Sequence, residues 1–371
     1  MSEFISDGKG HYGGISSILR IDAKIFIAIL LITFLGLITI YSSSSGDLSL
    51  VIKQATRIVI GIVTMIFIAQ VHPDNLRLFA PFLYFVTFVL LVAVLFFGVG
   101  NTADRWLDLY LFRFQPSELM KVFVPLMVAY YYSNKPLPPK SAYLLIASLI
   151  VLIPVLMIMK QPDLGTALLI GMSGAIAILL AGISLKFFLG SSFTIILLAP
   201  VLWMNMHDYQ KQRVLTFFDP ESDPMGAGYH LLQSKIALGS GGFFGKGLFN
   251  GTQSKLGFVP EHSTDFIFSA FGEEFGFLGV LLLLSLYLFI ALRGLSISVK
   301  ATDNFGRILS GTLSLTLFLY VIVNVGMVIG FLPVVGAPLP FMSYGGTSMV
   351  TLFATVGIIM SIKSHQRILR K

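Results

Sequence analysis

Long apolar stretches separated by short polar segments recur along the whole chain. Most are about 18 or more residues long, the length that a helix needs to cross the hydrocarbon core of a membrane. The pattern predicts roughly ten membrane-spanning helices, at residues 25–43, 54–71, 79–98, 117–134, 141–159, 164–182, 187–206, 265–292, 306–330 and 346–363. We therefore expect an all-α polytopic membrane protein, with residues 1–371 forming a single integral membrane domain.

One polar segment, residues 207–264, interrupts this pattern between the seventh and eighth predicted spans. It is too polar to span a membrane and far longer than an ordinary connection between helices. Connections of this length are usually functional. We therefore expect a large extracytoplasmic loop that takes part in the activity.

Positive charges predict the orientation of the chain. Lys9, Arg20 and Lys24 precede the first span, and Lys363 follows the last. Because Lys and Arg concentrate in cytoplasmic connections, we expect both termini in the cytoplasm and the loop 207–264 on the periplasmic side. The formal net charge of +7 then encodes orientation and gives no reason to expect a nucleic acid partner.

The composition supports a location in the cytoplasmic membrane. Hydrophobic residues make up 56% of the chain, charged residues 12%, and the mean hydropathy is +0.87. A soluble core cannot enclose so much apolar surface. The chain has no cysteine, which excludes disulfides, a thiol nucleophile and a thiolate metal site.

Two ionisable residues fall inside the fourth predicted span. Pro116 is suited to start a helix, on which Glu118 and Lys121, three residues apart, share one face. Charged residues inside a membrane are costly and by default mark a functional site. The alternative is a structural ion pair that holds two helices together.

Further cations are expected at the outer ends of spans or in the outer connections, namely Arg105, Lys160, Arg213 and Lys246. Scattered loop charge would account for them. An outer face rich in cations would also bind an anion, and Lys246 stands in a glycine-rich run whose backbone N–H groups suit a pyrophosphate.

Asp265 begins the eighth predicted span, and Glu273 and Glu274 follow it within the apolar run. Asp265 is suited to cap the helix, and a carboxylate at the edge of the membrane is equally suited to act as a general base. Both roles stay open. We expect Glu273 and Glu274 to be structural partners of cations such as Lys121 or Arg57.

Proline and glycine crowd residues 324–348, before the last span. Irregular backbone at membrane depth is tolerated only where protein buries it or where it lines a cavity. We expect this connection to wall an outward-facing cavity, and we count its Ser343 among the substrate-binding residues.

Taken together, these segments resemble the SEDS family of bacterial cell-wall proteins, which contains RodA, FtsW and SpoVE. The matching runs occur in family order and cover nearly the whole chain. They are "RWLDL…QPSELMK", "QPDLGTA", "GAGYH…QSKIALGSGG", "TDFIF…EEFG" and "LPVVGAPLPFMSYGGTS". The runs "DPESDPMGAGYH" and "GTQSKLGFVPE" are similar to those of the elongation branch, that of RodA.

The resemblance implies a peptidoglycan glycosyltransferase that polymerises lipid II on the outer face of the membrane during cell elongation. The essential aspartate of the family corresponds to Asp265, and Glu118 and Lys121 correspond to residues of its central cavity. The implied partners are a class B penicillin-binding protein that crosslinks the glycan and other membrane proteins of the elongation complex.

Joining an α-linked donor into a β-linked chain inverts the anomeric carbon, which a single displacement with one base achieves. We expect Asp265 to be this base and undecaprenyl pyrophosphate to be the leaving group. The positive charge that the leaving group needs would come from a divalent cation, Mg²⁺ or Mn²⁺, or from side chains. The candidate side chains are Arg105, Lys121, Lys160, Arg213 and Lys246. No spacing in the sequence identifies a set of metal ligands.

The main alternative function is a flippase that translocates lipid II. It also fits many spans and intramembrane charges. No inverted repeat is evident in the sequence, and the polar residues gather toward one face, which favours the transferase.

Overall fold

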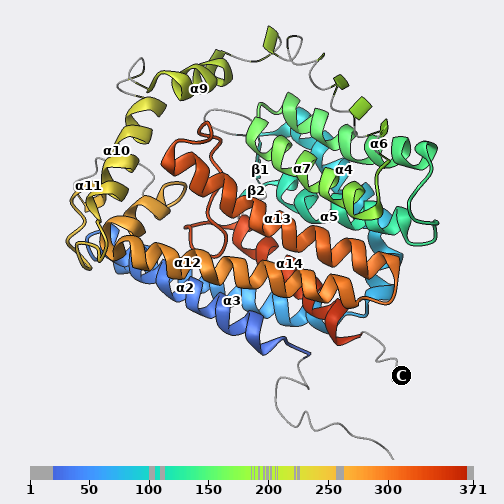
Figure 1. Cartoon of the computed structure of the whole chain (residues 1–371), viewed down its shortest axis with the longest axis horizontal. Coiled ribbons are helices and arrows are strands. Elements are labelled where there is room, and N and C mark those ends of the chain that lie inside the picture. The colour runs from blue at the N-terminus through green and yellow to red at the C-terminus, as the bar shows by residue number, and fades with distance from the viewer. Residues whose placement is uncertain are drawn as a thin grey trace, which may run out of the picture.

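The computed structural model describes residues 20–99, 105–108, 113–184, 208–220, 226–255 and 263–365, together with isolated positions between 186 and 223. These residues are almost entirely helical. Long helices pack side by side into one bundle, and shorter helices arch around one end of it (Figure 1). The only paired strands among the described residues, β1 (Leu107–Asp108) and β2 (Arg113–Phe114), form a two-residue antiparallel hairpin before the fourth long helix.

The long helices are α2 (Ala23–Ser43), α3 (Leu48–Gln70), α4 (Pro73–Phe97), α5 (Pro116–Tyr132), α6 (Ser141–Lys160), α7 (Leu164–Ala181), α12 (Ile267–Lys300), α13 (Asn304–Ile329) and α14 (Thr347–Ser364). The arch consists of α9 (Asp208–Phe218), α10 (Ala227–Ser240) and α11 (Thr252–Lys255).

Eight helices in the described part of the chain are long and apolar enough to cross a membrane: α2, α3, α4, α6, α7, α12, α13 and α14. Helix α5, with 17 residues, occupies the fourth predicted span. The seventh predicted span, 187–206, lies largely outside the described residues. The all-α polytopic architecture is confirmed, and the number of spans stays a prediction.

Carboxylates cap several of these helices at the positions where the sequence changes from polar to apolar. Asp22 accepts a hydrogen bond from Lys24 N at 3.0 Å before α2. Asp163 accepts one from Thr166 N at 3.2 Å before α7. Such bonds satisfy backbone donors that the first helical turn leaves free.

Helix α12 is interrupted at Gly276, where the backbone leaves helical geometry (φ 65°, ψ −167°). A Cβ at this position would lie 2.2 Å from Gly245 N, so only glycine fits. The uninterrupted helix expected over 265–292 is therefore wrong. The run consists of a short helix that begins at Ile267 and a long span after Gly276. A single glycine in an apolar run does not reveal this break.

The loop before α11 satisfies the backbone groups that the break exposes. Lys246 N and Gly247 N donate to the carbonyls of Glu273 and Glu274, each at 3.0 Å, and Phe277 N donates to a carbonyl of the same loop at 2.9 Å. Broken helices survive at membrane depth only where such partners exist.

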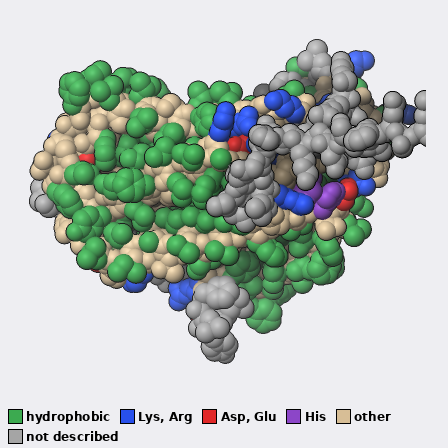
Figure 2. Space-filling model, turned by 90° about the horizontal axis from the view of Figure 1, so that it is seen from below, with side chains coloured by type: hydrophobic (Ala, Val, Ile, Leu, Met, Phe, Trp, Pro, Cys, Tyr) green, Lys and Arg blue, Asp and Glu red, His purple; other side chains and the backbone are tan. Residues whose placement is uncertain are grey.

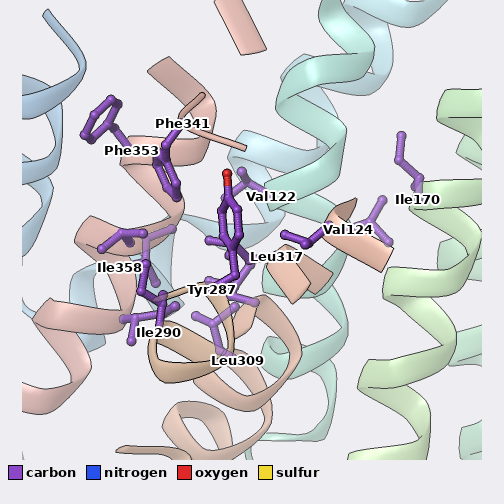
Figure 3. Close-up of a cluster of buried hydrophobic side chains, with 14 of the residues drawn as sticks. Val122, Val124, Ile170, Tyr287, Ile290, Leu309, Leu317, Phe341, Phe353 and Ile358 are labelled. Carbon is purple, nitrogen blue, oxygen red and sulfur yellow. The ribbon is translucent and has the colours of Figure 1, made fainter. Parts of the chain in front are cut away.

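The core lies between α5, α12, α13 and α14. Figure 3 shows Tyr287 among the apolar side chains of Leu309, Leu317, Phe341 and Phe353. Its hydroxyl donates to the carbonyl of Pro340 at 2.5 Å, in the connection between α13 and α14. The hydrogen bond of Tyr287 thus joins the core to this connection.

The outer faces of α3 and α4 expose large apolar side chains, among them Phe67, Leu78, Phe82 and Phe96. Figure 2 shows one such face of the molecule, on which hydrophobic side chains predominate and charged ones gather near one side. Such an apolar surface is suited to contact with lipid. Together with the eight helices that are long enough to cross a membrane, it makes the chain a multi-pass membrane protein.

Candidate active site

Asp265 lies in the turn just before α12, and its side chain is partly exposed. The connection between α13 and α14 holds the backbone of this turn. Ser343 Oγ donates to the carbonyl of Thr264 at 2.6 Å, and Tyr344 N donates to the carbonyl of Ser263 at 2.8 Å. The carboxylate therefore follows two residues whose backbone is held in place.

The capping role considered for Asp265 is not what the structure shows. The N-cap position of α12 is Phe266, and its side chain makes no capping hydrogen bond. General-base chemistry is the role left open for Asp265.

Asn324 of α13 fixes the same turn and was missed in the sequence. Its fully buried amide Nδ2 donates to the carbonyl of Asp265 at 2.8 Å and to that of Ala337 at 2.7 Å. An asparagine inside the apolar run 306–330 is the signal that would have identified it, because an amide at that depth needs partners.

The connection also approaches the carboxylate of Asp265 directly. A Cβ at Gly336 would lie 3.3 Å from Asp265 Oδ2. Two residues earlier, the carbonyl of Val334 accepts a hydrogen bond from Arg213 Nη1 at 3.3 Å. The exposed guanidinium of Arg213 on α9 thus contacts the same connection whose Gly336 approaches Asp265.

Ser343 is almost completely buried, and its hydroxyl is used twice. It accepts a hydrogen bond from Leu339 N at 2.8 Å and donates to Thr264. In this structure Ser343 positions the turn of Asp265, and direct substrate binding by Ser343 stays a prediction.

Glu118 and Lys121 form the intrahelical pair expected for them, with Nζ 2.6 Å from Oε1 and exposed fractions of 8% and 13%. They line a cavity of about 30 Å³ together with residues that include Thr316 and Tyr320. The oxygens of both these hydroxyls are buried without a partner among the described residues.

Two further candidate cations are already paired. Arg105 Nη1 lies 3.5 Å from Asp163 Oδ1. Lys246 Nζ lies 2.7 Å from Oε1 of the fully buried Glu273 and donates to Thr252 Oγ1 at 2.9 Å. Lys160, at the end of α6, is exposed. Arg213 contacts the connection between α13 and α14 through the carbonyl of Val334.

The expected partners of the two glutamates were wrong. Glu273 pairs with Lys246, and Glu274 accepts a short hydrogen bond from Ser42 Oγ. Neither Lys121 nor Arg57 takes part. The pairing depends on the loop before α11 folding back onto α12, which no local pattern encodes.

Among the residues that the structure describes, no group of three or more His, Cys, Asp or Glu could hold a metal ion. The divalent cation expected from the sequence stays a prediction.

Comparison with known proteins identifies the class to which this architecture belongs. The FtsW, RodA and SpoVE family, described as "Cell cycle protein", matches residues 22–368. The chain belongs to this family.

Individual relatives narrow the assignment. Peptidoglycan glycosyltransferase MrdB of Escherichia coli K12 is 45% identical over 354 residues, which cover 95% of this chain and 96% of MrdB. The probable peptidoglycan glycosyltransferase FtsW of Trichlorobacter lovleyi is 34% identical over 357 residues, covering 92% and 93% of the two chains.

Solved structures agree with this assignment. A chain from a peptidoglycan synthase complex, described as coordinating polymerization and crosslinking, superposes with a TM-score of 0.80 at 27% identity, covering 92% of this chain and 97% of that chain. The rod shape determining protein RodA of Thermus thermophilus gives 0.70 at 25% identity, with coverages of 92% and 96%. The chain is a RodA-like peptidoglycan glycosyltransferase.

Proposed function

We propose that the chain polymerises lipid II into glycan strands by an inverting single displacement in which Asp265 is the general base. The observation that carries this proposal is the turn of Asp265. A partly exposed carboxylate sits on a backbone that hydrogen bonds from Asn324, Ser343 and Tyr344 hold in place. A base must be held in this way to meet its proton in a fixed geometry.

The reaction joins two lipid-linked saccharides. An acceptor hydroxyl attacks the anomeric carbon of the donor, and Asp265 takes the proton of that hydroxyl. The new glycosidic bond forms as the bond from the anomeric carbon to the pyrophosphate oxygen breaks, and undecaprenyl pyrophosphate leaves with the electron pair. One displacement turns an α-linked donor into a β-linked product.

The departing pyrophosphate needs positive charge near Asp265. Arg213 is one candidate, because it is exposed and contacts the connection that approaches the carboxylate. Its planar guanidinium matches phosphate oxygens.

We propose a class B penicillin-binding protein as the partner and lipid II as the common donor and acceptor. The similarity to a chain of a complex that coordinates polymerization and crosslinking supports such a partner. With both termini in the cytoplasm, the site of Asp265 would face the periplasm, where crosslinking enzymes and other proteins of the elongation complex act.

Purified protein with a class B partner, supplied with lipid II, tests this function. We expect glycan polymer with β linkages. Translocation of lipid II in liposomes without any polymer would instead assign the chain as a flippase.

A further inference from the structure

Arg57 carries a charge inside a membrane span without a carboxylate partner in the described part of the chain. It lies nine residues after Leu48, the first residue of α3, or about 14 Å along the helix axis. One nitrogen of its guanidinium, Nη1, is buried and makes no hydrogen bond with the described residues. A charge at such a depth is costly, and by default it marks a functional site.

The setting of Arg57 differs from that of the other cations near the site. Lys121 and Lys246 lie 2.6 Å and 2.7 Å from glutamate oxygens. Arg57 instead lies over the ring of Tyr344, with the guanidinium carbon 4.3 Å from the ring centre. An aromatic face attracts a cation but does not neutralise it.

Tyr344 connects Arg57 to the active site. Its backbone N–H is the group that donates to the carbonyl of Ser263 at 2.8 Å, two residues before Asp265. The ring under Arg57 and the bond that holds the turn therefore belong to one residue.

A second contact from α3 fixes the same stretch. Gln54 Nε2 donates to the carbonyl of Ser343 at 3.0 Å, and Gln54 Oε1 accepts from Gly345 N at 3.3 Å. Gln54 precedes Arg57 by three residues and shares its side of the helix. The position of Arg57 beside the turn is thus set by three separate interactions.

This geometry favours an anion with oxygen atoms. A stacked guanidinium keeps its edge of N–H donors in one plane, which matches two oxygens of a phosphate. Arg57 as a whole is only partly buried, although its Nη1 is enclosed. An anion bound there would offset the cost of the uncompensated charge.

We propose that Arg57, stacked on Tyr344, binds a phosphate group of the isoprenoid-linked donor beside the Asp265 turn. The proposal rests on the proposed glycosyltransferase function. A pyrophosphate carried by an isoprenoid lies at the membrane surface with its chain among the helices, so an arginine set within a span is suited to meet it.

The test measures polymerisation of lipid II and, separately, inhibition by farnesyl pyrophosphate, a soluble isoprenoid pyrophosphate. Arg57→Gln should weaken inhibition and raise the KM for lipid II, each by roughly tenfold to a hundredfold, as expected when a charge-assisted hydrogen bond is lost. Arg57→Lys, which keeps the charge without the planar fork, should lie between wild type and Arg57→Gln.

Arg307→Gln is the matched control. Arg307 is an exposed arginine on α13, 17 residues before Asn324 and so about 26 Å along the helix from the site. It should leave both constants unchanged. A merely structural role for Arg57 would lower kcat through a displaced Asp265 but would not change inhibition by farnesyl pyrophosphate.

Three results would overturn the proposal. One is unchanged inhibition by farnesyl pyrophosphate in folded Arg57→Gln protein. Another is a KM effect that occurs only in vesicles containing phosphatidylglycerol, which would assign Arg57 to a phospholipid headgroup. The third is direct binding of farnesyl pyrophosphate that is equal in wild type and Arg57→Gln. Because binding is measured without turnover, failure of the glycosyltransferase function would be seen separately, as absence of polymer from the wild type.

Discussion

The side-chain amide of Asn324 joins two loops by donating to the carbonyl of Asp265 at 2.8 Å and to that of Ala337 at 2.7 Å. One loop carries the proposed base, and the other carries Gly336, which lies against the carboxylate of that base. A single buried residue of α13 thus sets the spacing between them.

We predict that Asn324→Asp removes both hydrogen bonds and so changes the spacing between the two loops. A carboxylate at position 324 would face two carbonyl oxygens and could not donate to them. A displacement of about 1 Å at a reacting group costs on the order of 100-fold in rate, so kcat should fall by about that factor with little change in the KM for lipid II.

The control for this variant is Ser234→Ala. Ser234 is also fully buried and donates to the carbonyl of Val328 of α13 at 3.0 Å, but it does not contact the turn. Its kcat should stay near that of the wild type. An unaltered kcat in folded Asn324→Asp protein would show that Asn324 does not position Asp265.

Gly276→Ala should prevent the α12 break from forming. Its Cβ would lie 2.2 Å from a backbone nitrogen, at a φ of +65°, and we expect destabilisation of about 4 kcal/mol or more. Gly239→Ala is the control, because no atom lies within 4 Å of a Cβ at that helical position. Thermal unfolding in detergent measures the stability of both variants. Equal melting temperatures would contradict the requirement for glycine at position 276.

The Glu118–Lys121 pair can be separated into structural and functional parts. Each of Glu118→Leu and Lys121→Leu leaves a buried charge without its partner and should cost about 3–5 kcal/mol, whereas the double variant should recover most of that loss. We expect the double variant to fold but to make no glycan polymer. Polymerisation at the wild-type rate by the double variant would show that the pair is structural only.

Acid should release the end of the bundle where α2, α12 and α14 meet. Asp22 Oδ2 lies 3.0 Å from Arg293 Nε and 2.7 Å from Lys363 Nζ. Burial raises the pKa of the Asp22 carboxyl, but hydrogen bonds and charges of Lys363 and Arg293 outweigh this effect, so the net pKa lies below that of an ordinary aspartate.

Because this pKa is lower in the folded state, ionised Asp22 stabilises the fold at any pH above the ordinary aspartate pKa. The stabilisation is lost as the pH falls through the lowered pKa of the folded state. The difference in melting temperature between wild type and Asp22→Asn should therefore be largest near neutral pH and shrink below about pH 4. A difference independent of pH would contradict ionisation of Asp22 as its origin.

Hydrophobic patterning alone located the long helices. Nine of the ten apolar runs correspond to α2 to α7 and α12 to α14, because a membrane span must be apolar over its full length whatever its neighbours are. The seventh run, 187–206, lies largely outside the described residues. Helix α5 and its Glu118–Lys121 pair also followed from local spacing, since three residues along a helix determine which side chains share a face.

Contacts between distant segments could not be predicted in the same way. Glu273 is paired with Lys246, which lies 27 residues earlier, because a loop packs against the break at Gly276. The importance of Tyr344 and Asn324 depends likewise on the connection between α13 and α14 reaching the turn of Asp265. Such contacts arise from tertiary folding and leave no periodic trace in the sequence.

The most direct test of this account is the rate of glycan polymerisation from lipid II by purified protein with a class B partner, comparing wild type with Asp265→Asn. Asparagine preserves the size of the side chain but cannot accept the proton. We predict polymer from the wild type and none from folded Asp265→Asn protein, with lipid II binding retained. Polymer formed at equal rates by both would contradict the assignment of Asp265 as the base.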